Sequence, residues 1–115
     1  MDKIELIIPS NPIYLQAIRL TTASLANNIG FDIDDIEDMK VVISEIVSFL
    51  IPLNDKIEIV FELHDDRINL ITKADVINQV DYCTNEEVKM KRQILMSLAD
   101  DIEVTDEKIS VVMNK

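Results

Sequence analysis

The apolar residues of the chain recur at two different spacings. Between residues 14 and 28, and again between residues 32 and 51, they return every three or four positions, as on the buried face of a helix. Between residues 56 and 63 they alternate with charged residues, which is typical of a half-buried strand. The pattern therefore predicts two N-terminal helices followed by a strand.

Residues that break or cap helices mark the ends of these elements. Pro9 closes a first strand over about residues 3–8. Gly30 is placed where a left-handed C-terminal cap would end the first helix. Asp32 can cap the second helix, and Pro52 ends it.

The second half of the chain continues the series with two hairpins and a helix. A capping box at Thr84 marks the start of that helix. The expected elements are strands over residues 56–63 and 68–72, a helix over 84–98, and strands over 102–105 and 109–113. The order β-α-α-β-β-α-β-β predicts an α+β fold, a two-layer α/β sandwich with a mixed, mostly antiparallel sheet and the helices on one face.

We expect one domain over residues 1–115, with a core made by the apolar faces of helices and strands. The expected core residues are Leu15, Ile18, Leu25, Ile36, Ile43, Leu50, Ile57, Ile59, Phe61, Leu95, Leu98 and Val111.

Charge and composition restrict the kinds of molecule that the protein is expected to bind and the cell compartment in which it is expected to act. The formal net charge of −11 disfavours direct contact with nucleic acid or an anionic membrane, whereas a basic protein partner is electrostatically easier. The single cysteine, Cys83, allows no intramolecular disulfide. With no signal-like N-terminus and no long apolar run, we expect a cytoplasmic protein without a membrane segment.

Few residues suggest chemistry by themselves. Gly30 is the only glycine, so the chain cannot form a glycine-rich phosphate loop. His64, the only histidine, falls in a predicted turn, where a solvated side chain is the usual outcome. Glu45 is the one charge in the apolar run of residues 41–53. It is either a helix position facing solvent or a polar partner, or a general base at a cleft.

Several segments resemble one known family. The segment Ile8-Pro9-Ser10-Asn11-Pro12, the helix of residues 14–28 and the run from Asp34 to Glu45 resemble the N-terminal half of the bacterial anti-sigma-factor serine kinases. These are small members of the Bergerat-fold (GHKL) ATPase superfamily. Residues 96–104 and 109–113 are similar to the end of that fold. The resemblance covers most of the chain and is weakest between residues 73 and 89.

The resemblance implies a nucleotide site with key contacts missing. Glu45 matches the family's general base. Phe49 stands where the family has an asparagine that helps to hold magnesium, and it has no donor or acceptor. Asp75 falls near the family's adenine-reading aspartate, but no glycine follows it. We therefore expect a degenerate, HATPase-like site, with Phe49 and Asp75 as its markers, no cofactor, no metal and no enzymatic activity.

By the same resemblance, the leading hypothesis is a non-catalytic regulator of transcription, a pseudokinase that binds a sigma factor or an anti-sigma-factor antagonist. Family members commonly form homodimers, so a second copy is another expected partner. The expected contact surface includes Asn11, Tyr14 and Arg19.

Two other functions stay open. One is a divergent ATP-dependent serine kinase that uses Glu45 as its base. The other is a sensor module that holds a small apolar ligand against Phe49, Val42 and Ile46, although core packing explains the same residues.

Overall fold

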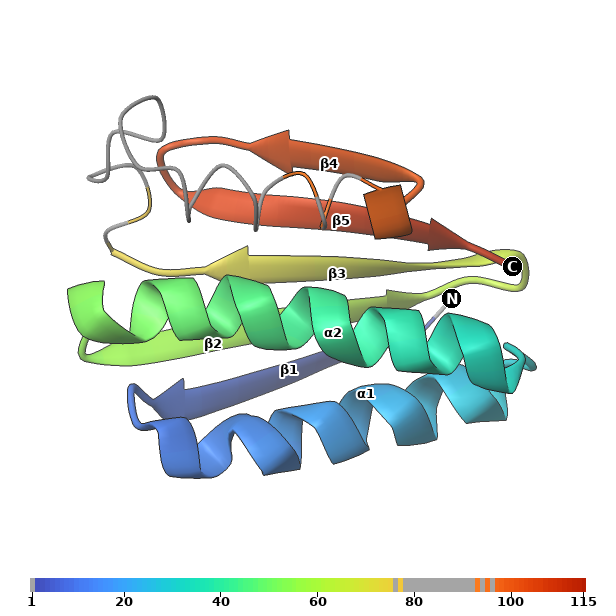
Figure 1. The fold of residues 1–115 in the computed structure, drawn as a ribbon, viewed down its shortest axis with the longest axis horizontal. Helices are drawn as coiled ribbons and strands as arrows, with labels where there is room; N and C mark the ends of the chain where they lie inside the picture. The colour runs from blue at the N-terminus through green and yellow to red at the C-terminus, as the bar shows by residue number, and fades with distance from the viewer. Residues whose placement is uncertain (1, 76, 78–92, 94, 96) are drawn as a thin grey trace.

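The computed structural model describes residues 2–75, 77, 93, 95 and 97–115, which form a sheet covered by helices (Figure 1). The elements are β1 (Asp2–Pro9), a 3-10 turn (Pro12–Tyr14), α1 (Leu15–Asn28), α2 (Ile33–Leu50), a second 3-10 turn (Ile51–Leu53), β2 (Lys56–Leu63), β3 (Arg67–Lys73), β4 (Asp101–Val104) and β5 (Lys108–Asn114). These bounds agree with the ends predicted from Pro9, Gly30, Asp32 and Pro52.

The five strands form one sheet in the order β1-β2-β3-β5-β4. All four pairings are antiparallel, so the described part of the chain has no parallel pair, although the sequence predicted a mixed sheet. The reason is the path of the chain. α1 and α2 form an antiparallel pair that returns the chain to the end of β1, so β2 runs back beside it. β4 has the direction of β3, but β5 lies between them.

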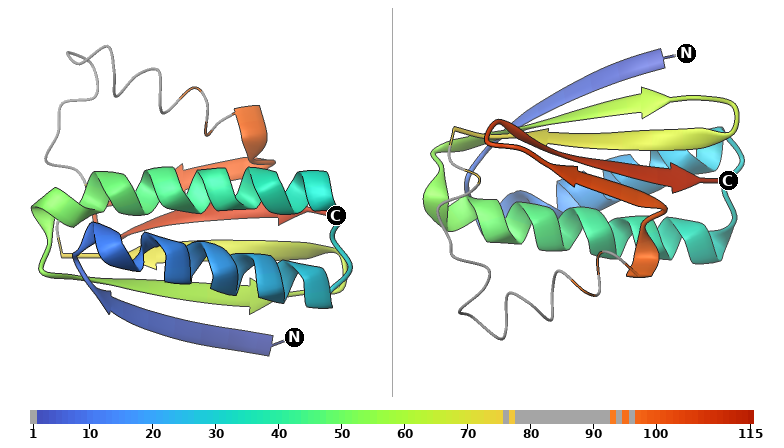
Figure 2. Two further views of the ribbon diagram at one scale, coloured as in Figure 1. Left: turned by 60° about the horizontal axis from the view of Figure 1, so that its bottom comes forward. Right: turned by 90° about the horizontal axis from the view of Figure 1, so that it is seen from above.

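Both helices lie on the same face of the sheet (Figure 2). The side chains of Phe61, Leu70 and Val111 are opposite one another on β2, β3 and β5, and all three are fully buried on the helix side. α1 contributes Ile18, Thr22 and Ala26, each with no exposed surface. The predicted two-layer α+β sandwich is confirmed.

The core prediction is largely confirmed. Eight of the expected residues are buried: Ile18, Ile36, Ile43, Leu50, Ile57, Ile59, Phe61 and Val111. The other four are half-buried and pack against the core: Leu15, Leu25, Leu95 and Leu98. Five α2 residues outside that list are also buried, namely Met39, Val42, Ser44, Ile46 and Val47. α2 is therefore covered on more than one side.

The third predicted helix falls mostly outside the described residues, together with its capping box at Thr84 and with Cys83. Residues 93, 95, 97 and 98 are described, and they have helical conformation. Within the described ranges, no helix combines the length and the apolar character needed to cross a membrane.

Candidate functional site

α2 positions the two residues that the sequence linked to catalysis. Glu45 and Phe49 are one turn apart on this helix, a spacing that places their side chains on the same face. Glu45 is half-buried, and its carboxylate oxygen Oε2 is shielded from solvent. Phe49 is also half-buried and packs against the core. The arrangement places an acidic group at the border between the core and solvent.

Phe49 supplies no ligand atom for a magnesium ion on this face of α2. Magnesium prefers oxygen ligands in near-octahedral geometry, and the aromatic ring of Phe49 offers none. No group of three or more His, Cys, Asp or Glu side chains gathers into a metal site among the residues that the structure describes. Phe49, one turn from Glu45, therefore stands where the resembled kinases have an asparagine ligand.

The end of β3 contains an unusual buried hydroxyl. Thr72 faces the helices between Ile59 and Ile109, has no exposed surface, and its Oγ1 has no hydrogen-bond partner within the described structure. A buried hydroxyl without a partner lowers stability, so packing alone does not explain a threonine at this position. Asp75, three residues later, is exposed. The structure therefore does not bring Asp75 into the buried region beside Thr72.

The residues proposed for an apolar ligand belong to the core. Val42 has no exposed surface, and Ile46 is only 2% exposed. Both lie in the main cluster of buried side chains, against which Phe49 also packs. Their burial supports a packing role.

The structure places the three expected contact residues at the start of α1. Asn11 Oδ1 accepts a hydrogen bond from the backbone N–H of Ile13 (3.1 Å), so Asn11 caps the 3-10 turn. Tyr14 is 40% exposed. Arg19 is half-buried, and its Nε donates to Ser44 Oγ of α2 (2.6 Å). Arg19, one of the expected contact residues, is thus anchored to α2.

Two exposed apolar residues near this segment were missed by the sequence analysis. Ile13 is 73% exposed and Leu20 is 59% exposed. Both positions fall outside the three- and four-residue spacing of the buried residues of α1. This offset is the sequence feature that could have predicted their exposure. Between Pro9 and Phe31 the only charged residue is Arg19, in a chain with 22 acidic residues. The outer surface of α1 is consequently almost uncharged and partly apolar. We refer to Ile13, Tyr14, Arg19 and Leu20 as the α1 surface.

Acidic groups gather at the beginning of α2. Asp32 Oδ1 accepts from the backbone N–H of Asp35 (2.8 Å) and caps the helix. Loss of hydration raises the pKa of Asp35 above its ordinary value, and the nearby carboxylates of Asp32, Asp38 and Asp100 add to this effect. The cluster therefore carries mutual repulsion at neutral pH.

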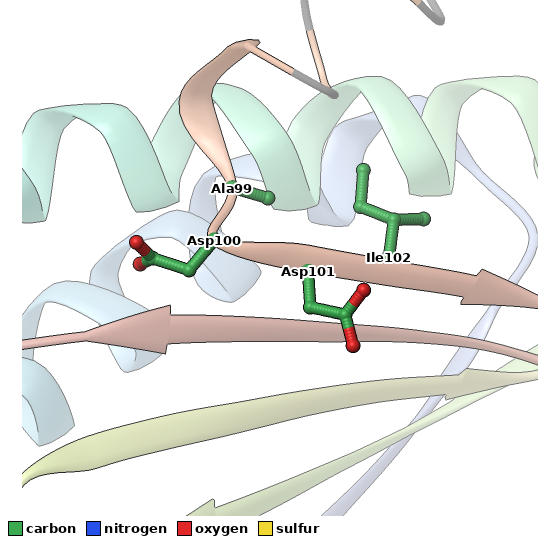
Figure 3. A pocket seen from close by; sticks show the side chains of 4 residues that line it. All are labelled: Ala99, Asp100, Asp101 and Ile102. Carbon is green, nitrogen blue, oxygen red and sulfur yellow. The ribbon is translucent and has the colours of Figure 1, made fainter.

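A shallow depression lies beside this cluster, lined by Ala99, Asp100, Asp101 and Ile102 (Figure 3). The carboxylates of Asp100 and Asp101 point in different directions, and Ile102 points toward α2. Asp100 Oδ2 accepts a hydrogen bond from the backbone N–H of Asn114 (2.6 Å), and its own N–H donates to Val112 O (3.0 Å). These bonds give Asp100 a structural role in joining β4 to β5.

Known proteins with similar sequences give the family. The serine-protein kinase RsbW of Bacillus cereus strain Q1 is 34% identical to this chain, over 99% of the chain and 84% of the relative. RsbW proteins of Bacillus thuringiensis subsp. konkukian strain 97-27 (34%) and Bacillus mycoides strain KBAB4 (33%) match over the same shares. No protein-family model matches the chain. The Q1 alignment spans 137 positions against 115 residues here, so the relative has at least 22 residues without a counterpart.

The names of these relatives correct one prediction. Phe49 and the missing glycines predicted a protein without enzymatic activity, whereas the relatives are named as protein kinases. That inference treated two missing contacts as loss of activity, and it is contradicted by the relatives. Because the identity reaches 34% over nearly the whole chain, the protein belongs to the RsbW family of serine-protein kinases.

Proposed function

We propose that the protein is a regulator that binds a protein partner through the α1 surface. The observation that carries this proposal is the contrast in charge. The molecule has a net charge of −11, yet the segment around α1 has a single charged residue and exposes Ile13 and Leu20. Exposed apolar groups with little charge around them are typical of protein interfaces.

The resemblance to anti-sigma-factor kinases supports the choice of partner. A sigma factor or an anti-sigma-factor antagonist in the cytoplasm is the partner we propose, with a second copy of the chain as a further one. Asn11 contributes indirectly, because it fixes the turn that presents Ile13 and Tyr14. Arg19 supplies the single positive charge on this surface.

The test is co-purification of the tagged chain with each sigma factor and antagonist-like protein of its own genome. Leu20→Glu introduces a charge into the α1 surface and should reduce recovery of the partner at least tenfold. Ile33→Glu is the matched control, because Ile33 is 76% exposed at the start of α2. Equal recovery with both variants would argue against the α1 surface. Recovery of no such protein by the natural chain would overturn the proposed function.

A second candidate is phosphoryl transfer to a serine of the partner, with Glu45 as the general base. The family name and the position of Glu45 at the border of the core support it. A base that accepts a proton from a serine hydroxyl needs a position within hydrogen-bond reach of it. Since the described residues do not supply the asparagine contact to magnesium, we assign no step to a metal.

Transfer of labelled phosphate from ATP to the co-purified partner would test this activity. Glu45→Gln keeps the size of the side chain but removes the base, so it should reduce transfer at least a hundredfold. Glu58→Gln on the opposite face of the sheet should leave transfer unchanged. Transfer that persists with Glu45→Gln would exclude Glu45 as the base.

A further inference from the structure

A short chain of hydrogen bonds joins the α1 surface to the helix that contains Glu45. Arg19 Nε donates to Ser44 Oγ (2.6 Å), and Ser44 Oγ donates to the backbone oxygen of Lys40 (2.6 Å). Ser44 is only 7% exposed. Its proton and a lone pair are therefore both engaged, and the hydroxyl has one defined orientation.

This contact restricts Arg19 more than a surface arginine is usually restricted. A free arginine side chain samples many rotamers, and ordering it on binding costs conformational entropy. Here Nε is already held by α2, while Arg19 makes no other side-chain hydrogen bond within the described structure. The Nε contact therefore orients the guanidinium group, and its two Nη nitrogens make no hydrogen bond within the described structure.

We propose that Ser44 is a positioning residue for partner binding. It holds Arg19 so that the one charged group of the α1 surface is ordered before the partner arrives. The inference rests on the proposed function, because it assumes that the α1 surface is where the partner binds. It adds Ser44, a buried residue of α2, to the residues that determine affinity for the protein partner.

The hydrogen bonds of Ser44 explain why its contact with Arg19 can be removed without destabilising α2. The hydroxyl bonds to Lys40 O within its own helix, and the helix already satisfies that carbonyl along its backbone. Replacement by alanine removes the contact to Arg19 and leaves the helix intact. Ser48 lies one turn further along α2, and no hydrogen bond joins it to Arg19 in the described structure, so Ser48→Ala is the matched control.

Nuclear magnetic resonance of the arginine Nε–H group tests the first step without a partner. In the natural chain the Arg19 signal should exchange slowly with water and show an ordered side chain. Ser44→Ala should abolish that protection, Ser44→Thr should restore it, and Ser48→Ala should leave it unchanged. An Arg19 signal that is equally protected in Ser44→Ala would overturn the proposal.

A double-mutant cycle with the co-purified sigma factor or antagonist tests the second step. Ser44→Ala should weaken binding about threefold to tenfold, and it should have no effect in a chain that already carries Arg19→Ala. Equal losses in both backgrounds would mean that Ser44 acts on the fold and not through Arg19. Unchanged affinity for Ser44→Ala would overturn the inference while the proposed function stands. Failure to recover any partner would overturn the proposed function itself.

Discussion

Gly30 lies directly beneath the side chain of Lys115. A Cβ atom placed on Gly30 would be 2.9 Å from Lys115 Nζ, closer than real carbon contacts allow. Gly30 also has a φ of +90°, and its N–H donates to Asn27 O (3.1 Å) as the chain leaves α1. The single glycine of the sequence therefore serves the turn between α1 and α2.

Gly30→Ala should lower the free energy of unfolding by about 1–2 kcal/mol, because a side chain is strained at positive φ. Chemical denaturation measures the loss. A double variant that also carries Lys115→Ala should recover only the part of the lost free energy that comes from contact between the new methyl group and Lys115. Most of the loss should therefore remain. Full recovery in the double variant would show that crowding, and not backbone conformation, determines the cost.

Ile43→Ala should lower the free energy of unfolding by about 2–5 kcal/mol, since it removes a fully buried side chain and leaves a cavity. Val41→Ala, on the same helix but 43% exposed, should cost about 0.5 kcal/mol or less. Urea denaturation of both variants provides the comparison. A loss below about 1 kcal/mol for Ile43→Ala would contradict its place in the core.

Thr72→Val should raise the free energy of unfolding by about 1 kcal/mol, because it replaces a buried hydroxyl that has no partner among the described residues with a methyl group of similar volume. Thermal denaturation should show a higher midpoint. Thr22→Val is a useful contrast, since Thr22 Oγ1 donates to Ile18 O (2.8 Å) and its loss removes a bond. A destabilised Thr72→Val variant would mean that the hydroxyl is satisfied in solution.

Asp35→Asn should stabilise the fold at neutral pH. Because the folded-state pKa of Asp35 lies above its ordinary value of 3.8, its ionised form opposes folding, chiefly through lost hydration and also through Asp32, Asp38 and Asp100. The advantage of the variant should shrink as the pH falls through the raised pKa and vanish below 3.8, where the natural side chain is protonated in both states. Thermal midpoints between pH 3 and pH 8 would show this. A constant difference across that range would contradict the raised pKa of Asp35.

The elements and their order follow from local sequence features. The alternation of residues 56–63 and the three- and four-residue spacing in the helices predicted the layers, and Asp32 and Gly30 marked helix ends that the structure confirms. Val60 shows the limit of the pattern. It lies on the open face of β2, between Glu5 of β1 and Ile71 of β3, yet it is only 1% exposed.

The candidate site was only partly accessible from sequence. Glu45 could be recognised because a lone charge in an apolar run is visible along the chain. The bond from Arg19 to Ser44 could not, because it joins residues 25 positions apart on two helices. No periodicity specifies which pair of side chains meets when two helices pack.

The sequence by itself determined the two-layer fold, the acidic character of the chain and the nearly uncharged segment around Arg19, since all three depend on residue type and spacing. Only the tertiary structure decided how far Ile13 and Leu20 are exposed and that Ser44 is buried against Arg19. It also decided that the hydroxyl of Thr72 is enclosed without a partner in the described structure. Exposure and pairing depend on which surfaces meet in space, and chain segments distant in sequence supply those surfaces.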